Sequence, residues 1–221
     1  MAVDKVKAKE QTASRSQDLA KNKSTFREYA EAIGMALLLA LFIRTFIVQA
    51  FKIPSGSMIP TLQIGDHILV NKLSYGIRIP FVESYIVNFS TPQRGDVVVF
   101  IFPEDRSKDF IKRVIGVAGD SVEVRDKKIF INGKQVDDPH AHFEGDDPQA
   151  AGGPNCTYCG PKTVPENHIF VMGDNRDRSY DSRFWGYVNL DEVRGKAFLI
   201  YWSWDGTDRW VRWERLGSLI R

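Results

Sequence analysis

Two short stretches of the chain carry side chains that could perform nucleophilic chemistry. In the first, residues 51–62 (FKIPSGSMIPTL), Ser55 and Ser57 flank Gly56 between two prolines and several apolar residues. A serine hydroxyl becomes a nucleophile when a neighbouring base activates it. Proline fixes φ and disfavours helix in the residue before it, so we expect this stretch to be extended and rigid. When this stretch is considered alone, an ordinary serine-containing turn is the alternative interpretation.

The base that the sequence offers is Lys112, within residues 109–116 (DFIKRVIG). Alternate residues of a strand share a face, so Lys112 is expected beside Phe110 and Val114 on an apolar surface. Burial there lowers the pKa of the amine, and a pKa of roughly 8 would raise its neutral fraction at pH 7 a few hundredfold. An edge-strand lysine that reaches solvent is the alternative. A Ser–His–Asp triad has no support, because the sequence assigns no partner to any of the four histidines, which are His67, His140, His142 and His168.

A third stretch, residues 173–186 (GDNRDRSYDSRFWG), is dense in short polar and charged side chains and follows an apolar segment. Asp–Arg pairs and side chain–backbone hydrogen bonds can make such a loop rigid. An ordinary surface loop would need fewer hydrogen-bonding groups. We therefore expect this loop to orient a group near it.

The N-terminal region is basic and leads into an apolar run. Residues 1–27 hold seven Lys/Arg and three Asp/Glu, whereas the remainder holds 23 and 25. A nearly neutral body argues against nucleic acid as a partner. Residues 32–51, about 30 Å long as a helix, are long enough to span a bilayer, with Arg44 close enough to one end to reach the interface. The charge asymmetry places the N-terminus on the cytoplasmic side.

Two alternatives to a retained anchor remain open for this run. It also fits a cleavable signal peptide, with residues 48–50 as the cleavage site, or a buried core helix. With the anchor interpretation, the expected organisation is a cytoplasmic tail at residues 1–29, a transmembrane helix at 30–51 and an extracytoplasmic β-rich domain at 52–221.

Beyond residue 62 the pattern favours strands over helices. Turn signals such as Gly-Asp and Asn-Gly separate short apolar runs, which predicts a mainly antiparallel β domain. The seven predicted strands cover residues 67–73, 96–102, 110–117, 121–125, 129–131, 168–172 and 196–202.

Residues 137–165 interrupt this pattern as a loop-rich excursion that holds both cysteines, Cys156 and Cys159. In an oxidising compartment the favoured interpretation is a disulfide that closes a small loop. A redox pair is an alternative, and so is a metal site completed by His140 and His142.

Taken together, the motifs resemble the bacterial type I signal peptidase family, membrane-bound serine proteases that remove signal peptides from exported proteins. Five motifs in order are far more specific than one Ser-Gly-Ser triplet. They are residues 54–62 (PSGSMIPTL), 65–72 (GDHILVNK), 94–100 (RGDVVVF), 110–116 (FIKRVIG, with Gly119 and Asp120 beyond) and 173–183 (GDNRDRSYDSR).

The resemblance implies a role for each matching residue. Ser57 would be the nucleophile and Lys112 the general base, without a histidine. Ser55 would join the Ser57 amide in the oxyanion hole, and Ser179 would hydrogen-bond and orient the Lys112 amine. The residues implied to brace the loop are Arg113, Asp174, Asp181 and Arg183.

The resemblance also implies how substrates bind. An extended signal peptide would add as a strand beside the site, with small residues at −1 and −3 in shallow pockets lined by Phe51, Ile53, Met58, Leu62, Phe110 and Ile111. No cofactor or metal is implied. The expected location is the inner (plasma) membrane, in functional association with the secretion machinery. Two alternatives remain: a peptidase dedicated to one precursor, and an anchored β domain that binds a partner without cleaving it.

Overall fold

The structure, a computed structural model, describes residues 25–78, 85–144 and 158–221. The chain divides into two units, Met1–Arg44 and Thr45–Arg221. In the first unit the described residues belong to one helix, and the second unit holds all the strands listed below.

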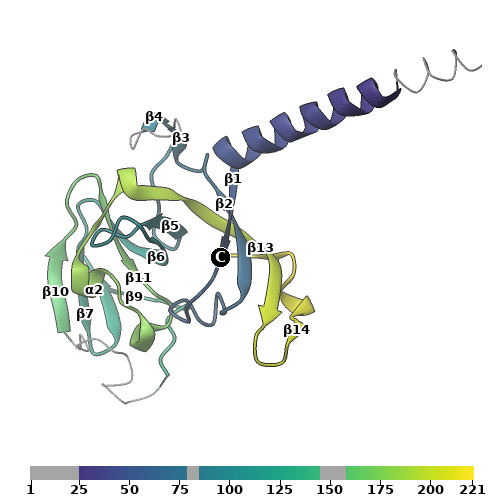
Figure 1. The fold of residues 1–221 in the computed structure, drawn as a ribbon. Coiled ribbons are helices and arrows are strands. Elements are labelled where there is room, and N and C mark those ends of the chain that lie inside the picture. The colour runs from purple at the N-terminus through teal and green to yellow at the C-terminus, as the bar shows by residue number, and fades with distance from the viewer. Residues whose placement is uncertain (1–24, 79–84, 145–157) are drawn as a thin grey trace, which may run out of the picture. The chain divides into compact units, whose positions relative to one another are not determined.

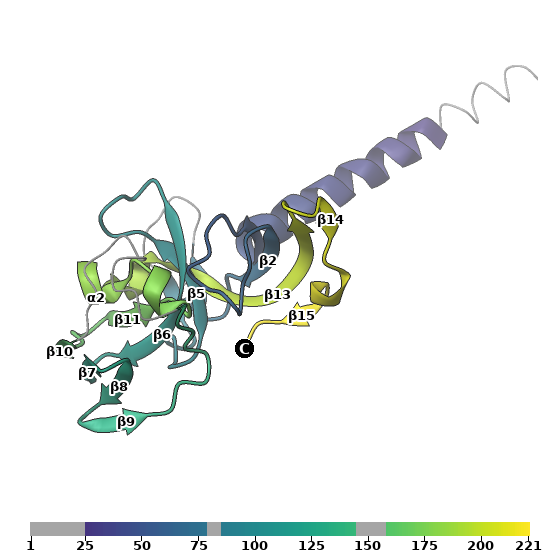
Figure 2. The same ribbon diagram turned by 90° about the horizontal axis from the view of Figure 1, so that it is seen from below.

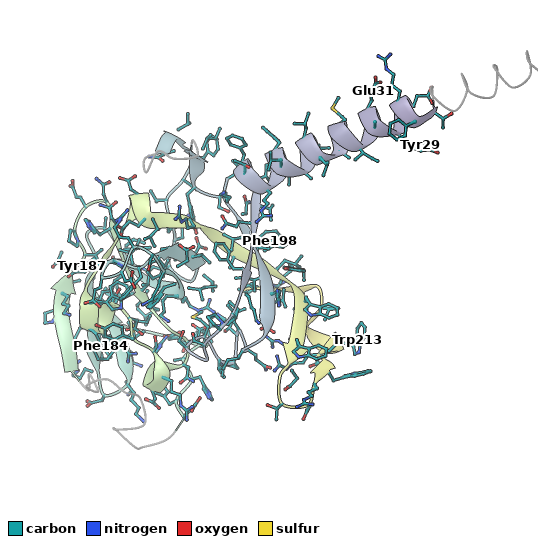
Figure 3. The ribbon with its side chains drawn as sticks, viewed as in Figure 1. Tyr29, Glu31, Phe184, Tyr187, Phe198 and Trp213 are labelled. Carbon is teal, nitrogen blue, oxygen red and sulfur yellow. The ribbon has the colours of Figure 1, made fainter. Side chains whose placement is uncertain are left out.

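The N-terminal helix covers Thr25–Phe46, which is 22 residues with a mean hydropathy of 1.6 (Figure 1). At about 1.5 Å per residue it is roughly 33 Å long, enough to cross a membrane by length and composition. Its most apolar window is not buried within the protein, and Tyr29 projects from the helix as an exposed side chain (Figure 3), which does not favour the core-helix interpretation.

The helix differs in its bounds from the expected span of residues 30–51. It ends at Phe46, and the residues from Val48 onward form strand β1 (Val48–Lys52) instead. Each residue of β1 pairs with β2 (Asp66–Asn71), from Val48 opposite Asn71 to Lys52 opposite His67. The partner strand, about 20 residues further along the chain, supplies hydrogen bonds that local hydropathy could not reveal.

The body is built from antiparallel sheets (Figure 1). The largest has the order β1-β2-β13-β5-β6-β11-β12, with β14 and β15 also pairing with β13; a second has the order β10-β7-β8-β9, and β3 pairs with β4. Their remaining bounds are β3 (Gly76–Arg78), β4 (Tyr85–Asn88), β5 (Val97–Ile101), β6 (Asp109–Val117), β7 (Ser121–Arg125), β8 (Lys128–Ile131), β9 (Lys134–Val136), β10 (Tyr158–Thr163), β11 (His168–Met172), β12 (Val188–Asn189), β13 (Val193–Asp205), β14 (Trp210–Val211) and β15 (Ser218–Leu219). The helical turns are η1 (Arg176–Arg178), α2 (Ser182–Trp185), η2 (Leu190–Glu192) and η3 (Trp213–Arg215).

The predicted fold class is confirmed, since the body is mainly β and antiparallel. The seven predicted strands appear as β2, β5, β6, β7, β8, β11 and β13. The prediction missed β10, whose six residues pair with β7 inside the expected loop-rich excursion, and also two-residue strands such as β12 and β14, which are too short to show an alternating pattern.

Strands β5 and β6 occupy the middle of the body, between the β7–β10 sheet and the β13–β15 end (Figure 2). Every residue of β5 is buried, because both faces of the sheet are covered. Val97 and Val99 pack into one apolar cluster with Met58 and Leu62 of the serine segment. Val98 enters a second cluster on the opposite face. The sheet therefore has apolar packing on both sides at the level of Lys112, which lies opposite Val98.

The serine segment is not extended throughout, so that prediction is wrong for residues 55–62. Residues 55–62 form consecutive turns, with the Ile59 amide bonded to the Gly56 carbonyl and the Leu62 amide to the Met58 carbonyl. The Ile59–Pro60 peptide bond is cis. A proline restricts its own φ and the residue before it, so Gly56 to Met58, which are neither, remain free to turn.

Gly65, which follows the serine segment, has no room for a side chain. Its φ is +93°, and a Cβ atom there would lie 2.1 Å from the Trp204 carbonyl oxygen. We therefore predict that Gly65→Ala lowers the free energy of unfolding by about 2–4 kcal/mol, because strain and a backbone clash add. Urea denaturation of the purified protein measures this. Gly206→Ala is the matched control, since nothing lies within 4 Å of its Cβ position. Equal stability of the two variants would contradict the prediction.

Candidate active site

Lys112 and Ser57 meet in the interior. Lys112 Nζ lies 2.6 Å from Ser57 Oγ, although the two residues are 55 positions apart in the sequence. The exposed fractions are only 4% for Lys112 and 7% for Ser57. Strand alternation points Lys112 to the same face as Phe110 and Val114, as expected, and its amine lies 5.7 Å from the Phe110 ring centre. The hydroxyl and the amine are thus within proton-transfer distance in a site nearly closed to water.

Burial lowers the pKa of Lys112 from 10.5 to about 8. Loss of hydration is the largest cause, because the protonated amine cannot keep its water shell. The negative charge of Asp181 acts in the opposite direction and raises the pKa, while the positive charge of Arg183 lowers it. Within the described residues, the amine has no carboxylate in hydrogen-bond contact. The environment therefore produces a lysine that is partly neutral near physiological pH.

Arg113, next to the lysine, points to the opposite face of β6 and meets Asp174. Arg113 Nε and Nη2 bind the two carboxylate oxygens at 2.8 and 2.7 Å, and the Arg113 and Asp174 side chains are 2% and 0% exposed. Thr61 Oγ1 donates a further hydrogen bond of 2.5 Å to this carboxylate. The pair connects the strand of the lysine, the loop at residue 174 and the end of the serine segment.

The loop at residues 173–183 is stabilised internally by Asp181 and Arg183. Arg183 binds both Asp181 carboxylate oxygens, at 2.8 and 3.0 Å. The Gly173 amide donates to the same carboxylate, and Ser179 also hydrogen-bonds to it. Burial alone would raise the pKa of Asp181, but Arg183 and these hydrogen bonds hold it below its ordinary value. Asp181 therefore keeps a negative charge near the lysine.

Ser179 does not make the hydrogen bond that was expected of it. Its hydroxyl accepts from the Gly173 amide at 3.1 Å and bonds to Asp181, and in the described part of the chain no hydrogen bond joins it to Lys112. A Cβ added at Gly173 would lie 2.3 Å from Ser179 Oγ and 2.4 Å from the Ser57 carbonyl oxygen. Ser179 is thus packed close to the turn that carries Ser57, and its hydroxyl bonds to Asp181, whose charge raises the pKa of Lys112.

Two hydrogen-bond donors beside the nucleophile have no partner in the described residues. They are the Ser57 backbone amide and the hydroxyl of Ser55, which is exposed. Groups that could bind an oxyanion must be free in this way before substrate arrives.

The residues expected to line substrate pockets fall into two groups. Ile53, Met58 and Leu62 are buried in one apolar cluster, with Phe51 and Ile111 partly buried against it. Phe110 packs against the other cluster and stacks on Phe102 at 4.2 Å. The structure therefore brings five of the six residues together.

Asn175 is a site residue to which sequence reasoning gave no role. Its backbone amide bonds to the Ser57 carbonyl oxygen at 3.1 Å, and its side-chain Nδ2 bonds to the Gly56 carbonyl oxygen at 3.3 Å. Nδ2 also donates to Glu144 Oε1 at 2.6 Å, while Oδ1 is buried without a partner in the described residues. An unsatisfied buried acceptor costs about 1–3 kcal/mol, so this arrangement is held by other interactions.

Glu144 reaches the site from the excursion at residues 137–165. The segment around His142 runs beside the loop: its amide bonds to the Asp174 carbonyl, and its carbonyl accepts from the Arg176 amide. Asp138 forms an ion pair with the buried Arg176. No sequence signal links Glu144 to residues 31 positions away; only the path of the excursion brings them together.

No described histidine ring takes part in the contact between Lys112 and Ser57. His67 packs against Tyr201 and His168 against Tyr187, and no hydrogen bond joins a described histidine ring to Ser57. The described residues contain no cluster of three or more metal-ligating side chains. Cys156 lies outside the described residues, so the disulfide remains a prediction.

Comparison with known proteins places this geometry in a family. The model of the signal peptidase family, peptidase S26, matches residues 26–202. The chain belongs to the signal peptidase family. Signal peptidase I of Pseudomonas fluorescens is 39% identical over 209 residues, covering 80% of this chain and 72% of the relative. Signal peptidase I of Pseudomonas aeruginosa is 37% identical with the same coverage, and that of Leptolyngbya laminosa is 37% identical over 82% of each chain.

Membership of the signal peptidase family makes the chain a serine endopeptidase of the signal peptidase I type. The match begins inside the N-terminal helix and ends in β13, so it includes all three motifs that meet in the site. The family resemblance inferred from five sequence motifs is confirmed.

The Arg113–Asp174 pair yields a stability prediction for this signal peptidase. Arg113→Ala would leave the Asp174 carboxylate buried without its partner, so we expect a loss of about 3–5 kcal/mol in the free energy of unfolding. Arg194→Ala is the control, because Arg194 pairs with Asp109 at 3.4 Å in a half-exposed position. Exposed pairs contribute less than about 1 kcal/mol. Chemical denaturation compares the two, and similar losses would show that Arg113–Asp174 is not a stabilising anchor.

Proposed function

We propose that this enzyme removes signal peptides from exported preproteins, with Ser57 as nucleophile and Lys112 as general base. The observation that carries the proposal is the 2.6 Å contact between Lys112 Nζ and Ser57 Oγ in a site where burial lowers the pKa of the lysine. The family membership supports the substrate class. Neither a cofactor nor a metal is needed, because a neutral amine can take the serine proton directly.

In the first half of the reaction, neutral Lys112 takes the Ser57 proton as Oγ attacks the carbonyl carbon of the scissile peptide. The tetrahedral intermediate carries the negative charge on the former carbonyl oxygen. It collapses when the protonated lysine gives its proton to the leaving amine, which breaks the C–N bond and releases the mature protein. The signal peptide remains as an ester on Ser57.

In the second half, Lys112 takes a proton from a water molecule as the water attacks the ester carbon. Collapse of the second intermediate breaks the bond to Ser57 Oγ, which recovers its proton from the lysine. The signal peptide leaves with a new C-terminal carboxyl group, which gives its proton to bulk water, and the free enzyme is restored. In both halves the Ser57 amide and the Ser55 hydroxyl, which are free in the described structure, would stabilise the oxyanion.

The proposed substrate path runs along β6. Residues 109–112 pair with β5 on one side, whereas β11 pairs only from Arg113 onward. An extended peptide can add to such a free edge through main-chain hydrogen bonds. Phe51 and Ile111, half-buried over the cluster that contains Met58, would then limit the −1 and −3 side chains to small ones. Phe110, on the other face, would border the same strand.

The proposal includes the location of the enzyme at a membrane and its orientation there. The N-terminal helix has the length and composition of an anchor, and the basic residues before it favour a cytoplasmic N-terminus and an extracytoplasmic body. Strand β1 begins two residues after the helix ends, so little chain separates the span from the catalytic domain. These features support a location at the membrane where preproteins emerge, and functional association with the secretion machinery is expected.

Removal of either reacting group tests the mechanism. We expect Ser57→Ala and Lys112→Ala to lower kcat on a purified preprotein by at least about 1,000-fold, because the two groups act as one unit. The double variant should be no worse than either single one. The assay is gel-resolved cleavage by the full chain in detergent. Wild-type turnover in either single variant would eliminate the proposed dyad.

The pKa of Lys112 sets the pH dependence. kcat/KM should rise with pH and reach half its plateau near pH 8, because the amine must be neutral in the free enzyme.

The free energy of unfolding should also depend on pH. Between pH 8 and 10.5 the unfolded chain binds more protons at Lys112 than the folded chain, so stability should rise with pH there. Lys112→Met should lack that rise, measured by denaturation across the range. A pH-independent difference between the two proteins would contradict the lowered pKa.

A further inference from the structure

Asn175 holds the two carbonyl groups that flank the nucleophile. Its backbone amide binds the Ser57 carbonyl, and its side-chain amide binds the Gly56 carbonyl. Asn175 is fully buried, so both contacts are shielded from water. One residue thereby determines the direction of two successive peptide groups.

The second contact determines where the Ser57 amide points. The Gly56 carbonyl and the Ser57 N–H belong to the same peptide group, which is planar and trans, so they point in opposite directions. When Asn175 Nδ2 holds the carbonyl, the N–H must face away from Asn175. That N–H has no partner in the described residues and is the proposed oxyanion donor.

Glu144 in turn sets the orientation of the Asn175 side chain. Both neighbours of Nδ2, the Gly56 carbonyl and Glu144 Oε1, are acceptors, so the nitrogen must face them. The other Glu144 oxygen pairs with Arg178 at 2.5 Å, and the Glu144 amide donates to Asp177. The carboxylate is therefore held in place from two sides.

From this chain of contacts we propose that Asn175 and Glu144 are positioning residues for the oxyanion hole. Glu144 orients the Asn175 amide, Asn175 orients the Gly56–Ser57 peptide, and that peptide presents its N–H to the developing negative charge. The inference rests on the proposed function, because it assigns the Ser57 amide to the reaction. It gives the segment before residue 145 a part in catalysis without contact to the substrate.

Glu144 can be altered without removing the backbone contacts that hold its segment. Those contacts come from the main chain of His142, to the Asp174 carbonyl and the Arg176 amide. Glu144→Ala is therefore expected to fold. Glu144→Gln keeps a carbonyl oxygen that can accept from Asn175 but loses the charge that pairs with Arg178.

The first experiment compares steady-state cleavage of a preprotein by the purified full chain. Loss of one oxyanion donor lowers kcat about 100- to 1,000-fold, so a donor that is only misaligned should cost less, on the order of 10-fold for Glu144→Ala. KM should change less than about 2-fold, and Glu144→Gln should recover most of the activity, since the effect is on the transition state. The control is Glu192→Ala, which removes another glutamate in an ion pair with an arginine, Arg106; the exposed fractions of the two glutamate side chains are 26% for Glu144 and 17% for Glu192.

The second experiment uses an oxyanion mimic. In a peptide aldehyde that ends in alanine, Ser57 Oγ adds to the aldehyde carbon, the serine proton passes to Lys112, and the former carbonyl oxygen occupies the oxyanion position. Glu144→Ala and Asn175→Ala should weaken inhibition by this aldehyde by the same factor as kcat. Binding of the matching peptide amide, which forms no adduct, should be unchanged. A merely structural defect would weaken both ligands together.

The outcomes separate the two proposals. If the wild-type enzyme cleaves no preprotein, or Ser57→Ala still cleaves it, the proposed function fails. If the wild type cleaves and Ser57→Ala does not, but Glu144→Ala matches Glu192→Ala in kcat, the positioning role is wrong. Equal losses of aldehyde and amide affinity would likewise overturn it.

Discussion

The site depends on the burial of one amine. Lys112 gains nothing from a carboxylate in direct contact, and its charged form has lost its water, so the pKa of the lysine falls to about 8. The apolar packing on both faces of β5 and β6 produces this condition, and a base that is partly neutral near physiological pH is the result. The charge of Asp181 limits the shift, because it favours the protonated amine from a distance.

Adjacent residues of β6 lie in different surroundings, because successive side chains of a strand point to opposite faces of the sheet. Lys112 faces a hydroxyl, whereas Arg113 faces the Asp174 carboxylate with two hydrogen bonds. An arginine stays charged when buried, so it suits a permanent ion pair, while a lysine can lose its proton. The same strand thus carries a lysine that can gain and lose a proton and, next to it, an arginine that forms a permanent ion pair. This ion pair ties the strand to the loop that carries Asn175, Ser179 and Asp181.

Some secondary-structure elements could be predicted from the local sequence and others could not. The strands at β2, β5, β6 and β13 were visible as apolar runs between turn signals, and the packing of Phe110 and Val114 followed from alternation. The end of the apolar helix was not visible, because the apolar residues Val48, Ala50 and Phe51 continue the run beyond the helix, although they pair with β2. Turns at residues 55–62 were also missed, since the two prolines restrict only themselves and the residue before each, and the rest of the segment stays free to turn.

The sequence by itself determined the residue types of the site, the order of its motifs and the strand that carries the base. Ser57, Lys112, Arg113 and Asp174 could therefore be named from spacing and family resemblance. Only the tertiary structure decided the hydrogen-bond partners: Ser179 with Asp181 and Gly173 inside one loop, and Asn175 with Gly56 and Glu144, 119 and 31 positions away. The physical reason is that a hydrogen bond requires atoms within about 3 Å in a given direction. Segments that are far apart in the sequence are brought to this distance and direction by the fold of the whole chain, which no local sequence pattern encodes.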